Sequence, residues 1–177
     1  MTDSAQRVAV VTGAAGAPGG AVLDEFPGSG WTVVALDRPG SRLENLGARP
    51  DVHPVPVDLA DRAAVGAAFG RVDVVGAPAG LIALAGGFRP SSLGDVTEDG
   101  LDEKWRSNVV GLLWCVQHAA PRMAAAGGGA VVTVGSRTAL TGSAPIAYAT
   151  SKAAVVRLPS CWPRSCGRRG SGSTAFD

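Results

Sequence analysis

The sequence predicts an α/β fold in which a doubly wound parallel sheet lies between two helical layers, with the sheet incomplete at its C-terminal edge. Short apolar runs alternate along the chain with segments of helical periodicity, which is the order expected of such a fold. The runs, such as residues 8–12, are almost continuously apolar, which is typical of parallel strands buried on both faces. No linker or repeat divides the chain.

Each element follows from its own local pattern. Five apolar runs predict strands at residues 8–12, 31–37, 52–58, 80–86 and 131–134. Apolar residues three or four positions apart predict helices at 21–26, 62–75, 97–126 and 148–158. Asp61 directly precedes the second helix and is the expected N-cap.

Charge and composition exclude several functional classes. The formal net charge is only +1, so a nucleic-acid partner is not expected. The first apolar stretch, residues 8–11, is too short for a signal peptide or a membrane span, so we expect a cytoplasmic protein with no membrane partner. The three cysteines form no spaced disulfide framework. Neither His53 nor His118 has the spacing of a metal ligand.

A glycine-rich turn, TGAAGAPGG at residues 12–20, joins the first strand to the first helix. Gly13 and Gly19 permit a tight turn and close backbone approach, and Pro18 is tolerated in a first helical turn. The free N–H groups and positive dipole of a helix N-terminus suit a pyrophosphate. An ordinary strand–helix loop is the alternative interpretation, and an acid at the end of the second strand argues against it.

That acid is Asp37, at the distance from the glycine turn that dinucleotide-binding folds use. A carboxylate at this position accepts hydrogen bonds from the adenosine ribose and repels a 2′-phosphate. The sequence therefore favours NAD over NADP, although Arg38 offsets part of the repulsion.

Tyr148 and Lys152 are four residues apart in a predicted helix and share one face. A nearby ammonium favours the phenolate form, which suits the phenol to general acid and base catalysis. This spacing is common by chance and usually marks only a helix surface. Here Tyr148 is the only tyrosine of the chain, and Lys104 is the only other lysine, which favours a function.

Together and in this order, the motifs from about residue 8 to 158 resemble the short-chain dehydrogenase/reductase family. The turn resembles that family's Thr-Gly-x-x-x-Gly-x-Gly loop, with Ala17 at the second glycine. The segment LIALAGG resembles its Asn-Asn-Ala-Gly motif, with Ala83 and Leu84 in place of both asparagines. Asn108 stands at the family's helix kink, and Ser136 precedes the Tyr-Lys pair.

The resemblance implies a Rossmann-type fold and an NAD(P)-dependent oxidoreductase that moves a hydride between nicotinamide and a small alcohol or carbonyl substrate. Tyr148 would exchange a proton with the substrate oxygen, and Ser136 would hydrogen-bond that oxygen. Lys152 would hold the ribose hydroxyls, and Asn108 a water that exchanges protons with solvent. Two plainer roles stay open: a strand-end turn residue for Ser136 and a backbone-bonding helix residue for Asn108.

The resemblance also implies a dimer or tetramer, formed through the long helix and the Tyr-Lys helix. It implies a cofactor site along the ends of the strands and the catalytic helix. The residues of that site are Thr12, Gly13, Gly16, Ala17, Pro18, Gly19, Asp37, Arg38, Asp58, Leu59, Ala85, Gly86, Tyr148 and Lys152.

Residues 159–177 depart from the family pattern, which continues with an amphipathic helix and a sixth strand. A single-base deletion explains this departure. In GC-rich codons, Leu-Thr-Glu-Leu-Leu-Ala-Ala-Glu-Leu then becomes Leu-Pro-Ser-Cys-Trp-Pro-Arg-Ser-Cys, which is the sequence of residues 158–166. We therefore divide the chain into a dinucleotide-binding domain, 1–158, and a non-native tail, 159–177, that we expect to be disordered. Sequencing the gene across codons 158 and 159 tests this hypothesis.

The altered tail has structural consequences. Pro159 and Pro163 are expected to end the catalytic helix early, and the fifth strand is expected to become an exposed apolar edge. We therefore expect poor solubility and little turnover. Three hypotheses stay open: an oxidoreductase, a dinucleotide-binding module without catalysis, and the inactive product of a damaged gene. The residues that choose the substrate are expected mainly in the part of the family pattern that is missing here and in the variable segment 137–147, so the motifs assign neither the substrate nor the reaction direction.

Overall fold

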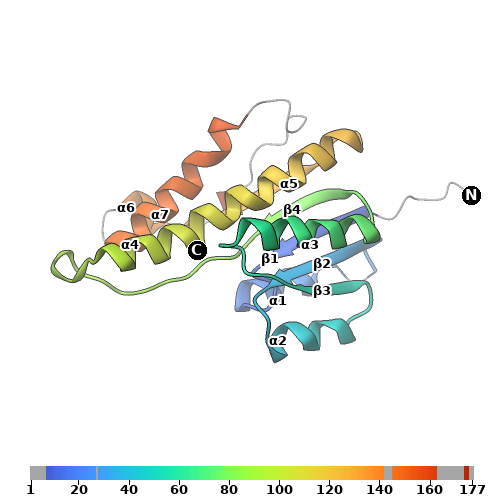
Figure 1. Ribbon diagram of the computed structural model, residues 1–177, viewed down its shortest axis with the longest axis horizontal. Coiled ribbons are helices and arrows are strands. Elements are labelled where there is room, and N and C mark those ends of the chain that lie inside the picture. Colours follow the sequence, from blue (N-terminus) through green and yellow to red (C-terminus); the bar gives the residue numbers. More distant parts are fainter. Residues whose placement is uncertain (1–6, 27, 142–144, 163–173, 176–177) are drawn as a thin grey trace, which may run out of the picture.

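The computed structural model describes residues 7–26, 28–141, 145–162 and 174–175 of the chain. They form one parallel sheet with the strand order β3-β2-β1-β4-β5-β6 and helices on both faces (Figure 1). This confirms the predicted doubly wound α/β fold. The winding reverses between β1 and β4, and ligands of such folds bind at this point, outside the carboxyl ends of the strands.

The strands and helices have the following bounds. The strands are β1 (Arg7–Thr12), β2 (Trp31–Asp37), β3 (Val52–Pro56), β4 (Pro78–Ala83), β5 (Ala130–Val134) and β6 (Thr174–Ala175). The α-helices are α1 (Ala17–Asp24), α2 (Ser41–Glu44), α3 (Arg62–Val75), α4 (Glu98–Trp105), α5 (Gly111–Ala125), α6 (Thr138–Thr141) and α7 (Ile146–Arg157). Short 3₁₀ helices are η1 (Asn45–Ala48), η2 (Leu93–Asp95) and η4 (Leu158–Cys161), and η3 (Arg106–Val110) is a π-helix.

The core lies on both faces of the sheet because successive side chains of a strand point to opposite sides. Val8 and Val10 of β1 join a cluster with α3, α5 and α7. Ala9 and Val11 join a second cluster with α1 and α2. Figure 1 shows α3 and the long α4–α5 helix on one side of the sheet and α1 and α2 on the other. Burial on both faces explains why β1 and β2 are almost continuously apolar.

The predicted long helix is confirmed, and it contains a wider turn. Helix α4, the π-helix η3 and α5 follow one another without a break, after Thr97 caps α4 by accepting a hydrogen bond from the Gly100 amide at 3.1 Å. A π-helix inside an α-helix is rare and occurs frequently at functional sites. Here it surrounds Asn108, where the kink was expected.

Several other predicted boundaries are confirmed, but α1 begins earlier than the predicted 21–26, at Ala17, and β4 ends earlier than the predicted 80–86, at Ala83. Asp61 caps α3, since its carboxylate accepts hydrogen bonds from the amides of Ala63 and Ala64 at 2.8 and 3.1 Å. The third strand also ends earlier than predicted, at Pro56, so Asp58 lies in the loop before α3. No helix in the part of the chain that the structure describes is long and apolar enough to cross a membrane.

The C-terminal edge requires a correction. Helix α7 ends at Arg157, and Pro159 lies in η4, as expected from the missing proline N–H; Pro163 is outside the described residues. The prediction that the whole edge of β5 is unpaired is wrong, because β6 pairs with Thr133 and Val134. Trp162 also packs against the core, so the beginning of the tail contributes to the fold. The expected disorder of residues 163–173 and 176–177 falls outside the described residues.

Candidate functional site

The predicted site residues meet at the carboxyl ends of the central strands. Thr12 ends β1, Asp37 ends β2, and Val134 ends β5. The segments that follow β1 and β4 and the helices α1 and α7 surround these ends. Because the strands are parallel, residues from distant parts of the sequence are brought to one side of the sheet.

The glycine turn after β1 needs its glycines for steric reasons. Gly13 has φ of +66°, and a Cβ on it would lie 2.8 Å from the Cα of Ala85. A Cβ on Gly19 would overlap the carbonyl oxygens of Gly13 and Ala14. The turn is closed by a hydrogen bond of 3.0 Å from the Gly16 amide to the Gly13 carbonyl. Only glycine at positions 13 and 19 allows α1 to begin this close to the sheet.

The N-terminus of α1 is open to solvent. Gly16 is its N-cap residue, and Gly16, Ala17 and Pro18 are all exposed. In the first turn of any α-helix the N–H groups have no acceptor within the helix, and Pro18 has none to satisfy. The amides of Ala17 and Gly19, together with the positive end of the helix dipole, can therefore hold an anion.

Asp37 connects the end of β2 to the glycine turn. Its Oδ2 accepts a hydrogen bond from the Ala15 amide at 2.9 Å, and its Oδ1 accepts one from the Arg38 amide at 2.7 Å. An ionised carboxylate has about four acceptor sites, so the half-buried group can accept further bonds. The Arg38 side chain lies exposed beside it.

Asp58 and Leu59 lie in the loop next to Asp37. The Val57 amide donates to the Asp37 carbonyl at 2.8 Å, which joins the two loops. The exposed Asp58 carboxylate accepts a hydrogen bond from the Ala60 amide at 2.9 Å and shapes the turn before α3. Leu59 packs against the core, and a Cβ on Gly111 of α5 would lie 2.9 Å from its Cβ.

Thr12 joins the ends of β1 and β4, where Ala83 and Leu84 stand instead of the family's two asparagines. Its carbonyl accepts the Leu84 amide at 3.3 Å, and its hydroxyl oxygen accepts the Ala85 amide at 3.2 Å. Thr12 is only 2% exposed. These bonds connect the backbone on both sides of the reversal point in the absence of the two side-chain amides.

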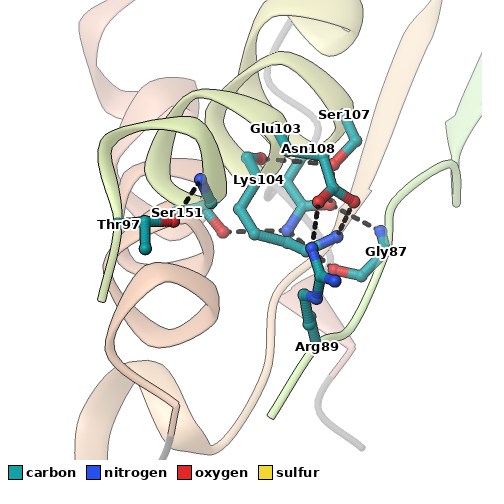
Figure 2. Close-up of polar contacts among 9 residues, drawn as sticks. Gly87, Arg89, Thr97, Glu103, Lys104, Ser107, Asn108 and Ser151 are labelled. Atoms are coloured by element: carbon teal, nitrogen blue, oxygen red, sulfur yellow. Dashed lines mark hydrogen bonds and ion pairs between the residues drawn. The ribbon is translucent and has the colours of Figure 1, made fainter. Parts of the chain in front are cut away.

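The Asn108 side chain is the most fully bonded polar group of the site (Figure 2). Its Oδ1 accepts the Gly87 amide at 2.7 Å, and its Nδ2 donates to the Gly87 carbonyl at 3.2 Å. Nδ2 also donates to the Ser151 hydroxyl at 2.8 Å, and the Ser107 hydroxyl donates to Oδ1 at 3.3 Å. Asn108 is 2% exposed, and its bond to Ser151 is fully buried while the other three are partly buried.

Ser151 extends this chain of hydrogen bonds to α7, and sequence reasoning did not identify it. Its hydroxyl donates to the Tyr148 carbonyl at 2.7 Å while it accepts from Asn108, and it is 1% exposed. The available signal was its place on α7, three residues after Tyr148 and directly before Lys152. A polar residue on the inward face of a helix needs a partner.

Tyr148 and Lys152 lie together at the end of β5. The Lys152 ammonium donates to the Val134 carbonyl at 2.9 Å and lies 6.0 Å from the centre of the Tyr148 ring. Lys152 is buried and Tyr148 is half-buried. The edge-to-face partner of the Tyr148 ring is Phe88, with ring centres 5.1 Å apart.

Ser136 follows β5 directly and takes part in a turn. Its hydroxyl lies 2.9 Å from the Thr138 hydroxyl and accepts the Thr138 amide at 3.3 Å. These are the bonds of a strand-end turn residue, one of the two roles that the sequence left open. A hydroxyl can accept more than one bond and rotate its proton, so Ser136 keeps the capacity to donate.

A small cavity of about 10 Å³ lies between β1, β4, β5 and α7. This volume is about that of one water molecule. Its lining residues are Thr12, Ala83, Ala85, Asn108, Leu112, Val134, Lys152 and Val155. Gly86 is nearby, since a Cβ on it would lie 2.9 Å from Asn108 Oδ1 and 3.7 Å from Lys152 Nζ.

Sequence reasoning also missed an ion pair on α4 between a buried lysine and an exposed glutamate. Lys104 is only 4% exposed, and its ammonium lies 2.7 Å from Oε1 of Glu103. The other oxygen of Glu103 lies 3.1 Å from Arg89 in the loop after β4 (Figure 2). The hydrogen bond and charge of Lys104, with a smaller contribution from Arg89, lower the pKa of Glu103 below its ordinary value. The carboxylate therefore remains charged near neutral pH.

Other titratable groups do not form a metal site. Among the described residues, no three His, Cys, Asp or Glu side chains are grouped so as to hold an ion. Cys115 is fully buried, and burial raises the pKa of its thiol to about 12. His118 stacks on Phe69, and burial, with the neighbouring Arg122 and Arg62, lowers the pKa of its imidazole.

The comparisons with known proteins identify the class of protein that this fold and site define. The short chain dehydrogenase family matches residues 7–170, so the chain belongs to that family. The match continues twelve residues beyond the boundary at 158 that the motifs suggested. Relatives with oxidoreductase and dehydrogenase names support an oxidoreductase.

Three similar proteins illustrate the match. Oxidoreductase asL5 of Sarocladium schorii is 33% identical over 88% of this chain and 64% of its own length. D-threitol dehydrogenase of Mycolicibacterium smegmatis is 31% identical over 93% of this chain and 66% of its own length. A short-chain dehydrogenase structure from Streptomyces avermitilis, 25% identical, has a TM-score of 0.81 over 88% of this chain and 59% of that one. This chain thus spans about two thirds of the length of these proteins.

The glycine turn yields a stability prediction with a control in the same segment. Gly13→Ala combines a left-handed φ with a Cβ 2.8 Å from backbone atoms, so it should lower the free energy of unfolding by about 1–3 kcal/mol. Gly20→Ala, in α1, meets nothing within 4 Å and should raise it by about 0.5–1 kcal/mol. Urea denaturation measures both values. Equal effects of the two substitutions would contradict the steric argument.

The hydrogen-bond chain yields a second prediction, using two serines bonded to Asn108. Ser151→Ala removes a buried bond of 2.8 Å and a partly buried bond of 2.7 Å, and it leaves one N–H of the buried Asn108 amide without an acceptor. It should lower the free energy of unfolding by about 1–3 kcal/mol. Ser107→Ala removes only bonds of 3.3 Å and should cost less than about 0.5 kcal/mol. A loss from Ser107→Ala as large as that from Ser151→Ala would show that Ser151 is not the essential link.

Proposed function

We propose that the chain is the dinucleotide-binding part of an NAD(P)-dependent oxidoreductase acting on a small alcohol or carbonyl substrate. The observation that carries this proposal is a chain of hydrogen bonds that starts at the Gly87 backbone and passes through Asn108 and Ser151. It ends at the backbone carbonyl of Tyr148, and the Lys152 ammonium lies 6.0 Å from the centre of the Tyr148 ring. This chain of hydrogen bonds joins the π-helix η3 to α7, the helix that carries the phenol and the ammonium, at the ligand-binding end of the sheet. Proton transfer by a general acid and base needs this kind of fixed geometry.

Tyr148 exchanges a proton with the substrate oxygen in this proposal. Its phenol gives the proton to a carbonyl oxygen in one direction and takes it from an alcohol in the other. The bound nicotinamide supplies the hydride chemistry at the adjacent carbon. Ser136 donates a hydrogen bond to the same oxygen and stabilises its developing negative charge.

Lys152 and Asn108 support the phenol. The Lys152 ammonium lies beside the Tyr148 ring and, in this proposal, holds the ribose hydroxyls. Asn108 borders the cavity of about 10 Å³, which has the volume of a single water. The side-chain amide of Asn108 is fully matched by Gly87, Ser151 and Ser107, which fits the plainer role of a backbone-bonding residue. In this proposal, a water in the cavity connects Lys152 to solvent for proton exchange.

The residues at the nucleotide side fit a dinucleotide. The exposed start of α1 offers amides and the positive dipole end to a pyrophosphate, and a Cβ on Gly16 would lie 3.2 Å from the Gly13 carbonyl oxygen. Asp37 supports NAD over NADP, since its carboxylate accepts hydroxyls and repels a phosphate. Asp58 and Leu59 form the neighbouring loop and suit the adenine side.

A dinucleotide-binding module without turnover is the second candidate. The turn around Ser136 favours it, because that hydroxyl is engaged with Thr138 rather than held toward Tyr148 by a described bond. The nucleotide side does not depend on Ser136. NADH binding without oxidation of any alcohol would support this candidate.

The main test uses Tyr148→Phe, which removes one hydroxyl and keeps the ring. NADH binding, followed by the fluorescence of the nucleotide, should change less than about twofold. Slow oxidation of a panel of alcohols, measured at high protein concentration, should fall by about 100-fold or more. Wild-type protein that binds no NADH, or a variant as active as the wild type, would contradict the proposed function.

A separate prediction concerns the choice of nucleotide. Wild-type protein should bind NADH more tightly than NADPH, and Asp37→Asn should reduce that preference by about tenfold, since it removes the charge. Asparagine keeps an oxygen that accepts the Ala15 amide, so the glycine turn is retained. Asp58→Asn, at an exposed loop carboxylate, is the control and should leave the ratio of the two affinities unchanged. A preference unaffected by Asp37→Asn would refute the role of the carboxylate.

A further inference from the structure

We propose that Phe88 is a specificity-determining residue that forms an apolar wall beside Tyr148 and selects substrates with an aromatic substituent on the reacting carbon. The inference rests on the proposed function for the identity of the reacting group. It adds a substrate class that can be assigned from this chain's own residues. Phe88 follows β4 and the Gly86-Gly87 pair, so it comes from the nucleotide half of the fold.

The rings of Phe88 and Tyr148 are in contact. Their centres are 5.1 Å apart and their planes meet at 78°, which is a favourable edge-to-face arrangement. Phe88 is nevertheless 61% exposed. Much of its apolar surface therefore faces outward next to the phenol, where a bound substrate would lie.

The backbone directly before Phe88 is held in place. Gly87 is bound through its amide and carbonyl by Asn108, at 2.7 and 3.2 Å. On the other side, only the exposed side chain of Arg89 pairs with Glu103, at 3.1 Å (Figure 2), and an exposed ion pair adds little. The anchored Gly87 limits where the Phe88 ring can lie, and a wall of a binding site needs such a limited position.

The segment that carries Gly87 and Phe88 passes close to α4. A Cβ on Gly87 would lie 3.1 Å from the Lys104 ammonium, so the backbone passes directly beside the buried lysine.

Leu93, later in the same loop, differs from Phe88. It is 81% exposed and belongs to the short helix η2, where Ser92 and Asp95 bond to each other. Exposure alone is thus general in this loop, whereas contact with Tyr148 distinguishes Phe88.

The chemistry of the wall indicates the substituent. A phenyl ring can stack or pack edge-on against Phe88 and remove apolar surface from water. A polyol would place hydroxyl groups against the same ring and lose hydrogen bonds with water. The Phe88 wall should therefore favour an aromatic alcohol over a polyol, with the hydroxyl at Tyr148 in both cases.

The experiment uses Tyr148 as its own reporter. Protein labelled with ¹³C in tyrosine gives signals from one residue, because the chain contains a single tyrosine. Benzyl alcohol and glycerol are titrated into the wild type, Phe88→Ala, Phe88→Leu and the control Leu93→Ala, with and without NADH. Benzyl alcohol should shift the Tyr148 signal of the wild type, and Phe88→Ala should weaken its affinity by about 3- to 10-fold.

The other variants give the controls. Phe88→Leu keeps an apolar side chain and should weaken the affinity for benzyl alcohol less than Phe88→Ala does. Leu93→Ala should leave this affinity unchanged. Circular dichroism should show that all variants are folded. Equal affinities of wild type and Phe88→Ala, no shift of Tyr148 by benzyl alcohol, or equally tight binding of glycerol would each overturn the proposal. Failure of the wild type to bind NADH would refute the proposed function. The two outcomes are distinguishable, because the effect of Phe88 on the affinity for benzyl alcohol is also measured without nucleotide.

Discussion

The site depends on one buried side-chain amide. Asn108 has two donors and two acceptors, and within the described residues each is matched: by the Gly87 backbone, by Ser151 and by Ser107. Leaving one such buried group unsatisfied costs about 1–3 kcal/mol, so this set of bonds favours a single arrangement of the elements that supply them. Those elements are the loop after β4, the π-helix η3 and helix α7. The wider turn of η3 allows an otherwise continuous helix to accommodate this residue.

Parallel strand topology explains why such distant residues can meet. Each strand ends on the same side of the sheet, so Thr12, Asp37 and Val134 lie near one another although their positions in the sequence are far apart. Connections between these ends then fix the loops. Thr12 holds the backbone after β4 with its carbonyl and hydroxyl, and Asp37 holds the glycine turn with its carboxylate. Backbone amides satisfied in this way replace the side-chain amides that the family motif would supply at positions 83 and 84.

The sequence predicted the elements well, because apolar periodicity and capping are local properties. It predicted the strands, the long helix and the cap at Asp61 within a few residues. The burial of Ser151 and Lys104 could not be predicted, because it arises from packing between α4, η3 and α7 rather than from the pattern of any one helix. Pairing of β6 with β5 was also missed, since two residues carry no periodicity. The motif spacing identified the residues of the candidate site, and their bonding partners required the structure.

The buried lysine on α4 lies where the loop after β4 meets the kinked helix. Lys104 and Arg89 share the single carboxylate of Glu103, and the exposed position of Glu103 lowers the desolvation cost of that arrangement. An ammonium with 4% exposure would be costly without this partner. The same carboxylate thereby fixes Arg89, the neighbour of Phe88, to the helix that leads into Asn108. Within the described residues, the loop after β4 is thus joined to this continuous helix at two points, by Arg89 to Glu103 and by Gly87 to Asn108, so the position of the loop depends on that of the helix.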